Sequence, residues 1–350
     1  MRRRSPLQAA LAATAVTAAT LASIGLATSA AGAAVHPTAT PLPAHVFAPY
    51  YEAYAAGNPL DQSRQSGDKY LSFAFLQTPA AGSCTADWNG STTQPVAPRT
   101  FGYDIAQIQA AGGNVIPSFG GYSADSTGTD IADSCTNVNK IAQAYEKVIT
   151  TYNVPRIDLD VEADSLTNTA GINRRNEAVA QVESWAKANG RSVQFSLTLP
   201  TTTTGLDAQE TPILQNAIAD GATISTVNLE TFDYYIGTKQ NMTADTKSAV
   251  NDTYAELQSL YPGDSSTQLW GMLGVTEMPG IDDYGPDETF LKSAAAGIEA
   301  WAQHKGLGLL SFWALQRDNG SCPGTKGAGA CSGLHQTKWF FSHTFQPFTS

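Results

Sequence analysis

Three acidic residues alternate with aliphatic ones in the segment Asp158-Leu159-Asp160-Val161-Glu162. A period of two is typical of a strand, whose successive side chains point to opposite faces. At about 3.3 Å per residue, the carboxylates would form a row with a spacing of about 6.6 Å. Carboxyl groups this close do not all ionise easily, so at least one should keep a proton near neutral pH. The segment therefore predicts a group that can act as a general acid.

Two other interpretations compete with a catalytic row. An exposed edge strand often carries alternating charges. A calcium loop also begins Asp-x-Asp, but it needs Gly at its sixth position and Glu at its twelfth, where this chain has Ala163 and Thr169. No nucleotide-binding glycine motif, Walker loop, His-Glu-x-x-His or Gly-x-Ser-x-Gly occurs. We therefore expect no metal and no cofactor, and the surrounding elements must decide between catalytic row and edge strand.

Strand-like and helix-like stretches alternate along most of the chain. Eight strands in alternation with helices favour parallel pairing and predict an α/β fold, a single (β/α)8 TIM barrel. The expected strands cover residues 46–50, 70–75, 114–119, 156–161, 192–199, 226–232, 268–274 and 307–312. The expected helices cover residues 101–111, 137–152, 170–188, 210–220, 243–260, 287–304 and 336–345, with a weak helical stretch near 61–66.

The acid row lies on the fourth of these strands. Helices cover the outside of such a barrel, so the aliphatic residues should face the helices and the carboxylates the interior. An edge strand does not exist there. Because buried charges without a cation cost several kcal/mol, catalysis is the better explanation of the row. Glu162 is expected nearest the C-terminal mouth, where barrel active sites lie.

The N-terminal residues predict an export signal. Met1-Arg2-Arg3-Arg4 precedes an Ala-, Leu- and Thr-rich run, and Ala31-Gly32-Ala33 offers a small-x-small cleavage site. A membrane anchor is the alternative. We expect residues 1–33 to be a signal peptide, 34–45 a proline-containing lead-in and 46–350 the catalytic barrel.

Charge and cysteine content describe the exported protein further. Removal of three arginines with the signal changes the formal charge from -11 to -14, which disfavours nucleic acid and anionic membranes as partners. We expect a secreted, extracellular monomer. Four cysteines suit two disulfides, and of three possible pairings we favour Cys84 with Cys135 and Cys322 with Cys331.

The acid row at the end of a fourth barrel strand resembles the motif of glycoside hydrolase family 18, the chitinases and related endo-β-N-acetylglucosaminidases. Four other strand ends resemble the same family. They are Phe47-Ala48-Pro49-Tyr50, Ser118-Phe119-Gly120-Gly121, Asn228-Leu229-Glu230-Thr231-Phe232-Asp233-Tyr234 and Ser311-Phe312-Trp313. The resemblance covers residues 46 to about 345, and the acid row is its most specific part.

The resemblance implies a retaining mechanism in which the substrate's own acetamido group attacks the anomeric carbon. Glu162 would be the general acid, Asp160 would orient the acetamido group, and Asp158 would share a proton with Asp160. Trp313 would form the floor under the sugar, because a flat aromatic ring packs well on a pyranose face. The further substrate-binding residues that the resemblance implies are Tyr50, Ser118, Glu230, Asp233 and Tyr234.

Three positions depart from the family pattern. Pro155-Arg156 stands where Asp-Gly often precedes the acids. Phe232 occupies a position where the family has Tyr, so the hydroxyl that would bind the acetamido group is missing there. Tyr234 fits an arrangement with Tyr after the Asp and could supply that hydroxyl. Glu230 replaces a Met, which would alter the contacts to the sugar.

Trp88, Tyr122 and Tyr235 follow expected strands and are either sugar platforms or structural residues. The resemblance implies hydrolysis of β-1,4-linked N-acetylglucosamine, with chitin as the expected substrate. An endo-β-N-acetylglucosaminidase acting on N-linked glycans is one alternative. A catalytically silent chitin- or glycan-binding lectin is another, although such relatives usually lose the terminal Glu or the second Asp.

Overall fold

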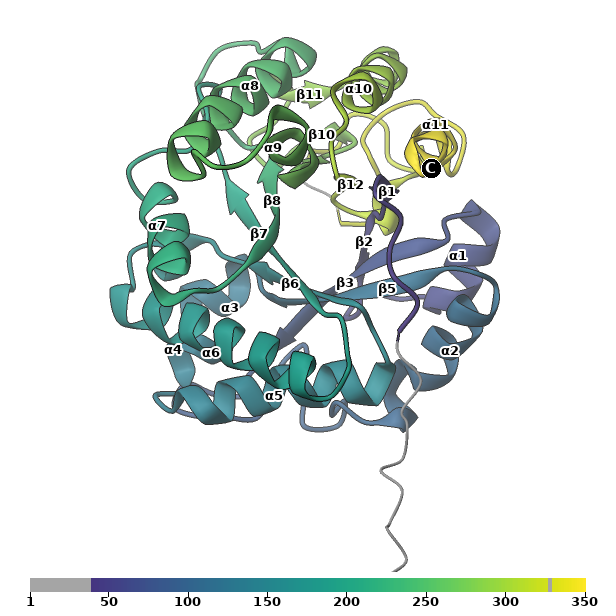
Figure 1. Ribbon diagram of the computed structural model, residues 1–350. Coiled ribbons are helices and arrows are strands. Elements are labelled where there is room, and N and C mark those ends of the chain that lie inside the picture. The colour runs from purple at the N-terminus through teal and green to yellow at the C-terminus, as the bar shows by residue number, and fades with distance from the viewer. Residues whose placement is uncertain (1–38, 327–328) are drawn as a thin grey trace, which may run out of the picture. The chain divides into compact units, whose positions relative to one another are not determined.

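The computed structural model describes residues 39–326 and 329–350. The expected signal peptide, residues 1–33, and the first part of the lead-in lie outside the described residues. The described residues form a parallel β-barrel that helices surround, as the alternation of elements predicts (Figure 1).

Eight parallel strand positions make up the barrel in the described part of the chain. The first position is split into β1 (Val46–Phe47) and β2 (Tyr50–Glu52), and Pro49 between them has no N–H to donate. β1 pairs with the last barrel strand and β2 with the second, so the split strand closes the sheet. The other strands are β3 (Tyr70–Gln77), β5 (Asn114–Gly120), β6 (Arg156–Asp160), β7 (Gln194–Pro200), β8 (Ile224–Glu230), β9 (Leu273–Glu277) and β12 (Leu309–Phe312).

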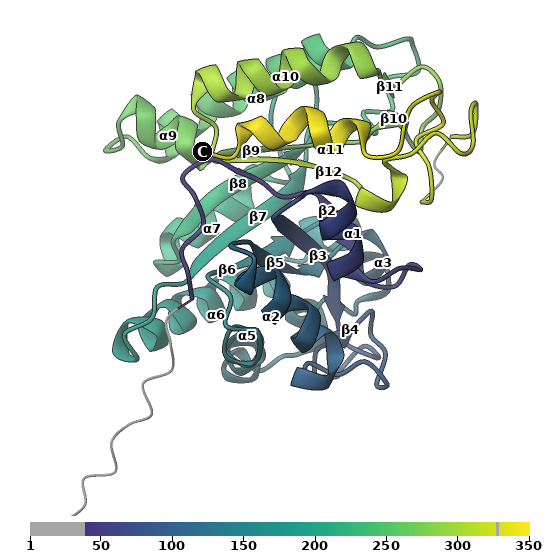
Figure 2. The same cartoon turned by 90° about the vertical axis from the view of Figure 1, so that its right-hand side faces the viewer.

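Helices cover the outside of the barrel (Figures 1 and 2). The helices that follow barrel strands are α1 (Pro59–Ser66), α2 (Tyr103–Ala110), α5 (Val138–Tyr152), α6 (Thr169–Ala188), α7 (Thr211–Asp220), α8 (Met242–Leu260), α10 (Lys292–Lys305) and α11 (Phe340–Phe345). Shorter elements lie in the connections: β4 (Asp87–Trp88), α3 (Tyr122–Thr127), α4 (Ile131–Ser134), α9 (Ser266–Met272), β10 (Gly280–Ile281) and β11 (Thr289–Phe290). No helix among the described residues is both long and apolar enough to cross a bilayer.

The seventh barrel strand begins later than the sequence predicts. Residues 268–274 are the expected strand, but the structure has α9 at Ser266–Met272 and β9 at Leu273–Glu277. A capping box starts the helix. The Ser265 hydroxyl accepts a hydrogen bond from the Gln268 N–H, and the Gln268 side chain accepts one from the Ser265 N–H. Because these side chains satisfy N–H groups at the start of the helix, they favour a helix over a strand in this apolar stretch.

The acid row belongs to β6 and its extension, and its two faces separate as the alternation predicts. Ile157, Leu159 and Val161 are buried in the core between the barrel and helices α5 and α6. Burial of each such side chain stabilises the fold by about 1.5–3 kcal/mol. Asp158 and Asp160 point to the other side, and each is only 2% exposed. The aliphatic face therefore holds the acids inside the barrel.

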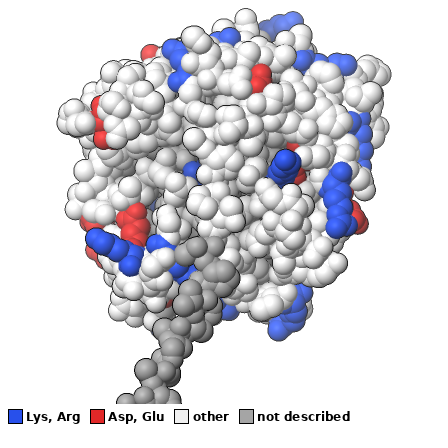
Figure 3. Space-filling view, turned by 45° about the vertical axis from the view of Figure 1, so that its right-hand side comes forward, with Lys and Arg blue, Asp and Glu red and all other residues white. Residues whose placement is uncertain are grey.

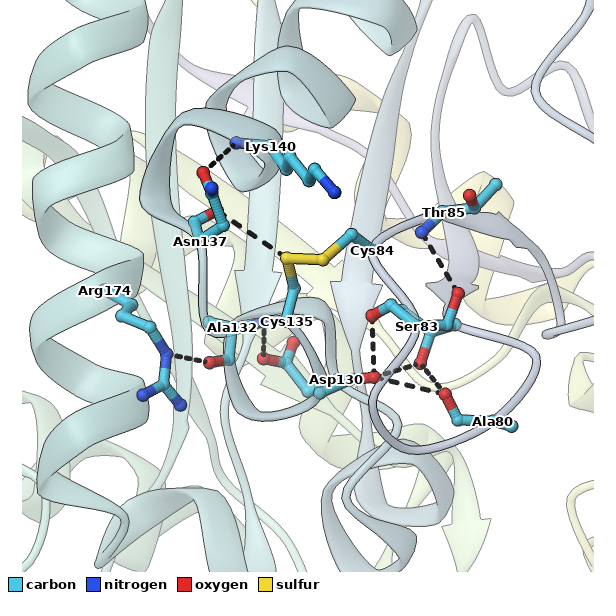
Figure 4. The surroundings of a disulfide bond; sticks show 12 residues. Ala80, Ser83, Cys84, Thr85, Asp130, Ala132, Cys135, Asn137, Lys140 and Arg174 are labelled. Carbon is cyan, nitrogen blue, oxygen red and sulfur yellow. Dashed lines mark hydrogen bonds between the residues drawn. A yellow bond between two sulfur atoms is a disulfide. The ribbon is translucent and has the colours of Figure 1, made fainter.

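Both expected disulfides are present. Cys322–Cys331 closes a short loop after β12. Cys84–Cys135 joins the connection after β3 to the end of α4, as Figure 4 shows. Beside it, the Ser134 hydroxyl donates to the Ser83 carbonyl over 2.8 Å. The bridge thus fixes the segment that follows β5, on the side of the barrel next to β6.

On the face that Figure 3 shows, Lys and Arg side chains are scattered among uncharged residues and do not form a continuous basic patch. A continuous basic stripe is the usual footprint of a nucleic-acid-binding surface.

Candidate active site

The inner face of the barrel is built from rungs of residues in register. The two rungs around the acid row each place an acid of β6 between residues of β5 and β7: Ser118, Asp158 and Ser196, then Gly120, Asp160 and Thr198. Residues two apart on a strand share one face, so both rungs point into the barrel. The acids of β6 are therefore stacked along the barrel axis toward its C-terminal mouth.

Asp158 is held by four hydroxyl groups. Its Oδ2 atom accepts hydrogen bonds from Tyr50 (2.9 Å) and Ser118 (2.7 Å), and its Oδ1 atom accepts from Ser196 (2.6 Å) and Thr198 (2.9 Å). Burial raises the pKa of Asp158 above its ordinary value, and these hydroxyl groups lower it. Asp158 is thus held in a fixed position at the inner end of the acid row. Tyr50 and Ser118 contribute to the site by holding Asp158 in place.

Asp160 lies one rung higher and lines the cavity. Its Oδ1 atom is buried and has no hydrogen-bond partner among the described residues. Burial raises the pKa of Asp160 well above its ordinary value, and the neighbouring carboxylates of Glu162 and Glu230 raise it further. A buried carboxylate oxygen without a partner is costly, so this atom is placed to bind a donor on a ligand.

Glu162 follows the end of β6 and also lines the cavity. Its backbone N–H donates to Oδ2 of Asp125 on α3 over 2.5 Å, which fixes the main chain at the acid. Burial raises the pKa of the Glu162 carboxyl to about 7, a hydrogen bond from the Tyr122 main chain lowers it, and the charge of Asp233 raises it. The carboxyl can therefore carry a proton near neutral pH, as a general acid must.

Glu230, at the end of β8, is the third carboxylate at this mouth. One oxygen of each of Asp160, Glu162 and Glu230 lies within 4.8 Å of the others. Burial and the charge of Glu162 raise the pKa of Glu230 well above its ordinary value. Three carboxylates this close share protons as a group, because full ionisation of all three is disfavoured.

A second acidic group, Asp233, Asp282 and Glu288, also brings carboxylate oxygens within 4.8 Å. Main-chain N–H groups occupy these oxygens. Asp282 accepts from Asp233 N–H (3.1 Å) and Gly285 N–H (3.0 Å), and Glu288 accepts from Tyr234 N–H (2.7 Å). Oxygen ligands of this kind suit hard divalent cations in general. Here the carboxylates organise the two loops that border the cavity.

The cavity at the C-terminal mouth of the barrel has a volume of about 950 Å³. Trp313, directly after β12, lies in its wall and stacks on Phe75, with ring centroids 5.4 Å apart and an angle of 13° between the ring planes. The Tyr50 ring supports Trp313 from another side, at 5.6 Å. The indole is therefore held rigidly by two aromatic neighbours, as a platform for a sugar ring requires.

Gly120 and Gly121 explain the Ser-x-Gly-Gly segment in steric terms. Both have positive φ, 94° and 83°. A Cβ atom on Gly120 would lie 2.0 Å from the carbonyl oxygen of Asp160, and one on Gly121 would lie 2.5 Å from the Phe75 ring. Only glycine allows the main chain to approach the acid row and the aromatic floor this closely.

The structure does not bring Tyr234 into the cavity. Its hydroxyl lies near Glu277 of β9 and Thr246 of α8, and Tyr234 is absent from the cavity lining. The family resemblance implies a substrate contact for Tyr234, but β8 ends at Glu230 and the main chain then turns, with φ of 50° at Asp233 and 56° at Tyr235. Asp233 and Tyr235 line the cavity instead.

The structure distinguishes the three aromatic residues that the sequence left as either sugar platforms or structural residues. Trp88 is fully buried, and its indole N–H donates to the Tyr152 hydroxyl over 2.8 Å, so it is structural. Tyr122 and Tyr235 line the cavity and are 68% and 63% exposed. They form an aromatic rim on the side of Glu162 and Asp233.

Several site residues have no signal in the sequence. Asp125 lies in a polar stretch, and only the fold places it under Glu162. In the sequence, Phe75 looks like an ordinary core residue of a strand, yet its ring stacks on Trp313. Glu52 and Arg317 are far apart in the chain and both line the cavity, because the first and last barrel strands are neighbours. Sequence spacing could not have predicted these residues, because they come from elements that only the fold brings together.

Comparisons with known proteins agree with this architecture. No family model matches the chain. A probable bifunctional chitinase/lysozyme of Escherichia coli is 29% identical over 320 residues, which are 88% of this chain and 35% of the relative. Endochitinase 11 of Metarhizium anisopliae is 28% identical over 286 residues, which are 79% of this chain and 53% of the relative. The chain thus spans about a third to a half of the length of these curated relatives.

Solved structures cover the described barrel more fully. Active domain 2 of a thermostable chitinase from Pyrococcus furiosus, as catalytic-site mutants complexed with chito-oligosaccharides, has 28% sequence identity and a TM-score of 0.78. That match covers 89% of this chain and 97% of the domain. A GH18 chitinase from Pseudoalteromonas aurantia shares the fold at 15% identity, with a TM-score of 0.54 and coverage of 84% and 97%. With the acid row at the mouth of the same barrel, these similarities to chitinases support glycoside hydrolase family 18 as the family that the chain resembles.

Proposed function

We propose that the protein hydrolyses β-1,4-linked N-acetylglucosamine, with chitin as its substrate. The observation that carries this proposal is the position of Glu162. Its carboxyl, with a pKa raised to about 7, borders a cavity that also exposes the rigid indole of Trp313. Two curated relatives named as chitinases and a structural neighbour solved with chito-oligosaccharides support the substrate class.

In the proposed reaction, the protonated carboxyl of Glu162 donates its proton to the glycosidic oxygen as the bond to the anomeric carbon breaks. The carbonyl oxygen of the substrate's acetamido group attacks that carbon and forms an oxazolinium ion. Water then attacks the anomeric carbon, which opens the oxazolinium ring, and gives a proton back to the Glu162 carboxylate. Configuration at the anomeric carbon is retained, because two displacements occur there.

Asp160 binds the N–H of the acetamido group in this scheme. Its buried Oδ1 atom has no partner among the described residues, so it is available as an acceptor. Asp158 holds Asp160 from below through a shared proton, while the hydroxyls of Tyr50 and Ser118 keep Asp158 in place. The carboxylate of Asp160 stabilises the positive oxazolinium ion by its charge.

The proposed site of action is outside the cell, and residues 1–33 are the proposed export signal ahead of the lead-in and barrel. The two disulfides, Cys84–Cys135 and Cys322–Cys331, suit an oxidising compartment. Extracellular insoluble polymers such as chitin are accessible only to exported enzymes.

Product analysis on colloidal chitin, beside a high-mannose glycoprotein, tests the proposal. Release of chito-oligosaccharides supports a chitinase, whereas release of the glycan from the glycoprotein would favour an endo-β-N-acetylglucosaminidase. NMR of the products directly after cleavage should show the β-anomer first if configuration is retained. The Glu162→Gln variant should lose turnover and keep sugar binding, because the amide has the same shape but no acidic proton. Binding without turnover by the wild type would favour a lectin.

A further inference from the structure

The wall of the cavity across the barrel from the acid row carries a second set of charged residues. We call it the distal wall and define it by Glu52, Tyr54, Asp283 and Arg317, all of which line the cavity. Glu52 ends β2, and the order of the sheet places β3 and β5 between β2 and β6 (Figure 1). Glu52 therefore lies on a strand that is not a neighbour of β6 in the sheet.

Glu52 has the properties of a built binding group. It is only 4% exposed, and its Oε1 atom accepts a hydrogen bond from the Tyr54 hydroxyl over 2.9 Å. Its Oε2 atom is buried and has no hydrogen-bond partner among the described residues. The main chain of Glu52 is fixed by two hydrogen bonds with the side chain of Gln316, each 3.1 Å long. Such an oxygen, held rigidly in a cavity wall, can accept a hydrogen bond from a donor on a ligand.

The charges around the cavity favour a positive ligand. Its lining contains six acidic residues and one basic residue, Arg317, among the described residues. The Arg317 guanidinium donates to the carbonyls of Pro279 and Ile281 and lies near several carboxylates, including Glu52 and Asp283. Acidic residues therefore outnumber the basic residue in the lining. A concave site lined by one sign of charge concentrates ligands of the opposite sign.

We propose that the distal wall binds the ammonium group of a glucosamine unit, so that the preferred substrate is partially N-deacetylated chitin. This inference rests on the proposed function, because the sugar at the cleavage site must keep its acetyl group for the acetamido attack. A glucosamine unit can then lie only elsewhere in the cavity, and the distal wall is such a place. There the ammonium would contact Oε2 of Glu52, with Asp283 and the 47% exposed ring of Tyr54 beside it.

The test compares chito-oligosaccharides that are partially deacetylated with the same preparation after complete re-acetylation, at weakly acidic pH. The readouts are the ratio of kcat/KM for the two preparations and the sequence of the products by mass spectrometry. In wild-type products, glucosamine should be enriched at one fixed distance from the cut. In Glu52→Gln the ratio should fall about tenfold, equivalent to about 1.4 kcal/mol, and the enrichment should disappear. Asp252→Asn removes an exposed charge on α8 and is the matched control, with an unchanged ratio.

Cleavage of the fully acetylated preparation shows that each variant is folded and active. If Glu52→Gln cleaves neither preparation, Asp283→Asn replaces it, because Asp283 is exposed and its substitution leaves the core intact. A smaller fall in the ratio is expected for that variant. Two results overturn this inference alone. One is glucosamine spread evenly over all product positions away from the cut, and the other is a kcat/KM ratio that is the same in the wild type and these variants. Failure of the wild type to cleave the acetylated preparation overturns the proposed function and this inference with it.

Discussion

Replacement of Glu162 by Gln should stabilise the protein while it removes activity. In the folded protein, burial raises the pKa of this carboxyl from 4.5 to about 7. Because the folded-state pKa is the higher one, the native protein binds more protons than the unfolded chain between these values. The carboxyl therefore destabilises the fold as pH rises through this window, with the full cost present only above about pH 7. Gln never ionises, so the variant avoids that cost.

The size of the effect follows from the two pKa values. A pKa difference from 4.5 to about 7 corresponds to about 3 kcal/mol when the carboxyl is fully ionised. At about pH 5 only about 1 kcal/mol of this cost is present, and at about pH 8 nearly all of it is. We therefore expect Glu162→Gln to exceed the wild type in unfolding free energy by about 1 kcal/mol at the lower pH and about 3 kcal/mol at the higher.

Urea unfolding followed by tryptophan fluorescence, with the disulfides intact, measures these free energies. The control Asp252→Asn changes an exposed side chain, so its effect should stay within about 0.5 kcal/mol at both pH values. In parallel, wild-type kcat/KM on chito-oligosaccharides should fall about tenfold per pH unit above about pH 7, because the acid loses its proton. An equal free-energy difference between Glu162→Gln and the wild type at both pH values would refute the assignment of the retained proton to Glu162.

Substitutions at three further positions test other parts of the site. Trp313→Ala should lower kcat/KM on chito-oligosaccharides at least about tenfold through loss of the sugar platform, and unchanged steady-state kinetics would contradict that role. Gly120→Ala should lower the unfolding free energy by about 3 kcal/mol or more, since its Cβ would meet the Asp160 carbonyl at 2.0 Å, and an unchanged melting temperature would show that the strands can separate freely. Asp125→Ala should lower kcat about tenfold with little change in KM through loss of the hydrogen bond to the Glu162 main chain. Asp125→Asn should restore it, because the Asp125 pKa of about 9 means that the acid is already protonated at neutral pH; equal kcat in both variants would rule out this positioning role.

The alternation in β6 could be recognised in the sequence because it depends only on local geometry. A strand must turn Leu159 and Val161 to one side when it turns Asp160 and Glu162 to the other. The family resemblance implies a substrate contact for Tyr234, and there the structure differs. Positive φ at Asp233 and Tyr235 turns the main chain after β8, so strand alternation does not extend to Tyr234. Loop conformation of this kind depends on partners such as Asp282 and Glu288 in another loop, which no local pattern contains.

The sequence by itself determined the number and order of the barrel strands and the sides of β6, since each depends on periodicity. It left three disulfide pairings possible, and the structure has the favoured one. Only the tertiary structure decided which groups surround the acids. The four hydroxyls on Asp158 come from β2, β5 and β7, and the carboxyl under the Glu162 main chain comes from α3. Closure of the barrel brings these side chains together across long stretches of chain, and the pKa of Glu162 depends on that closure because burial is its largest cause.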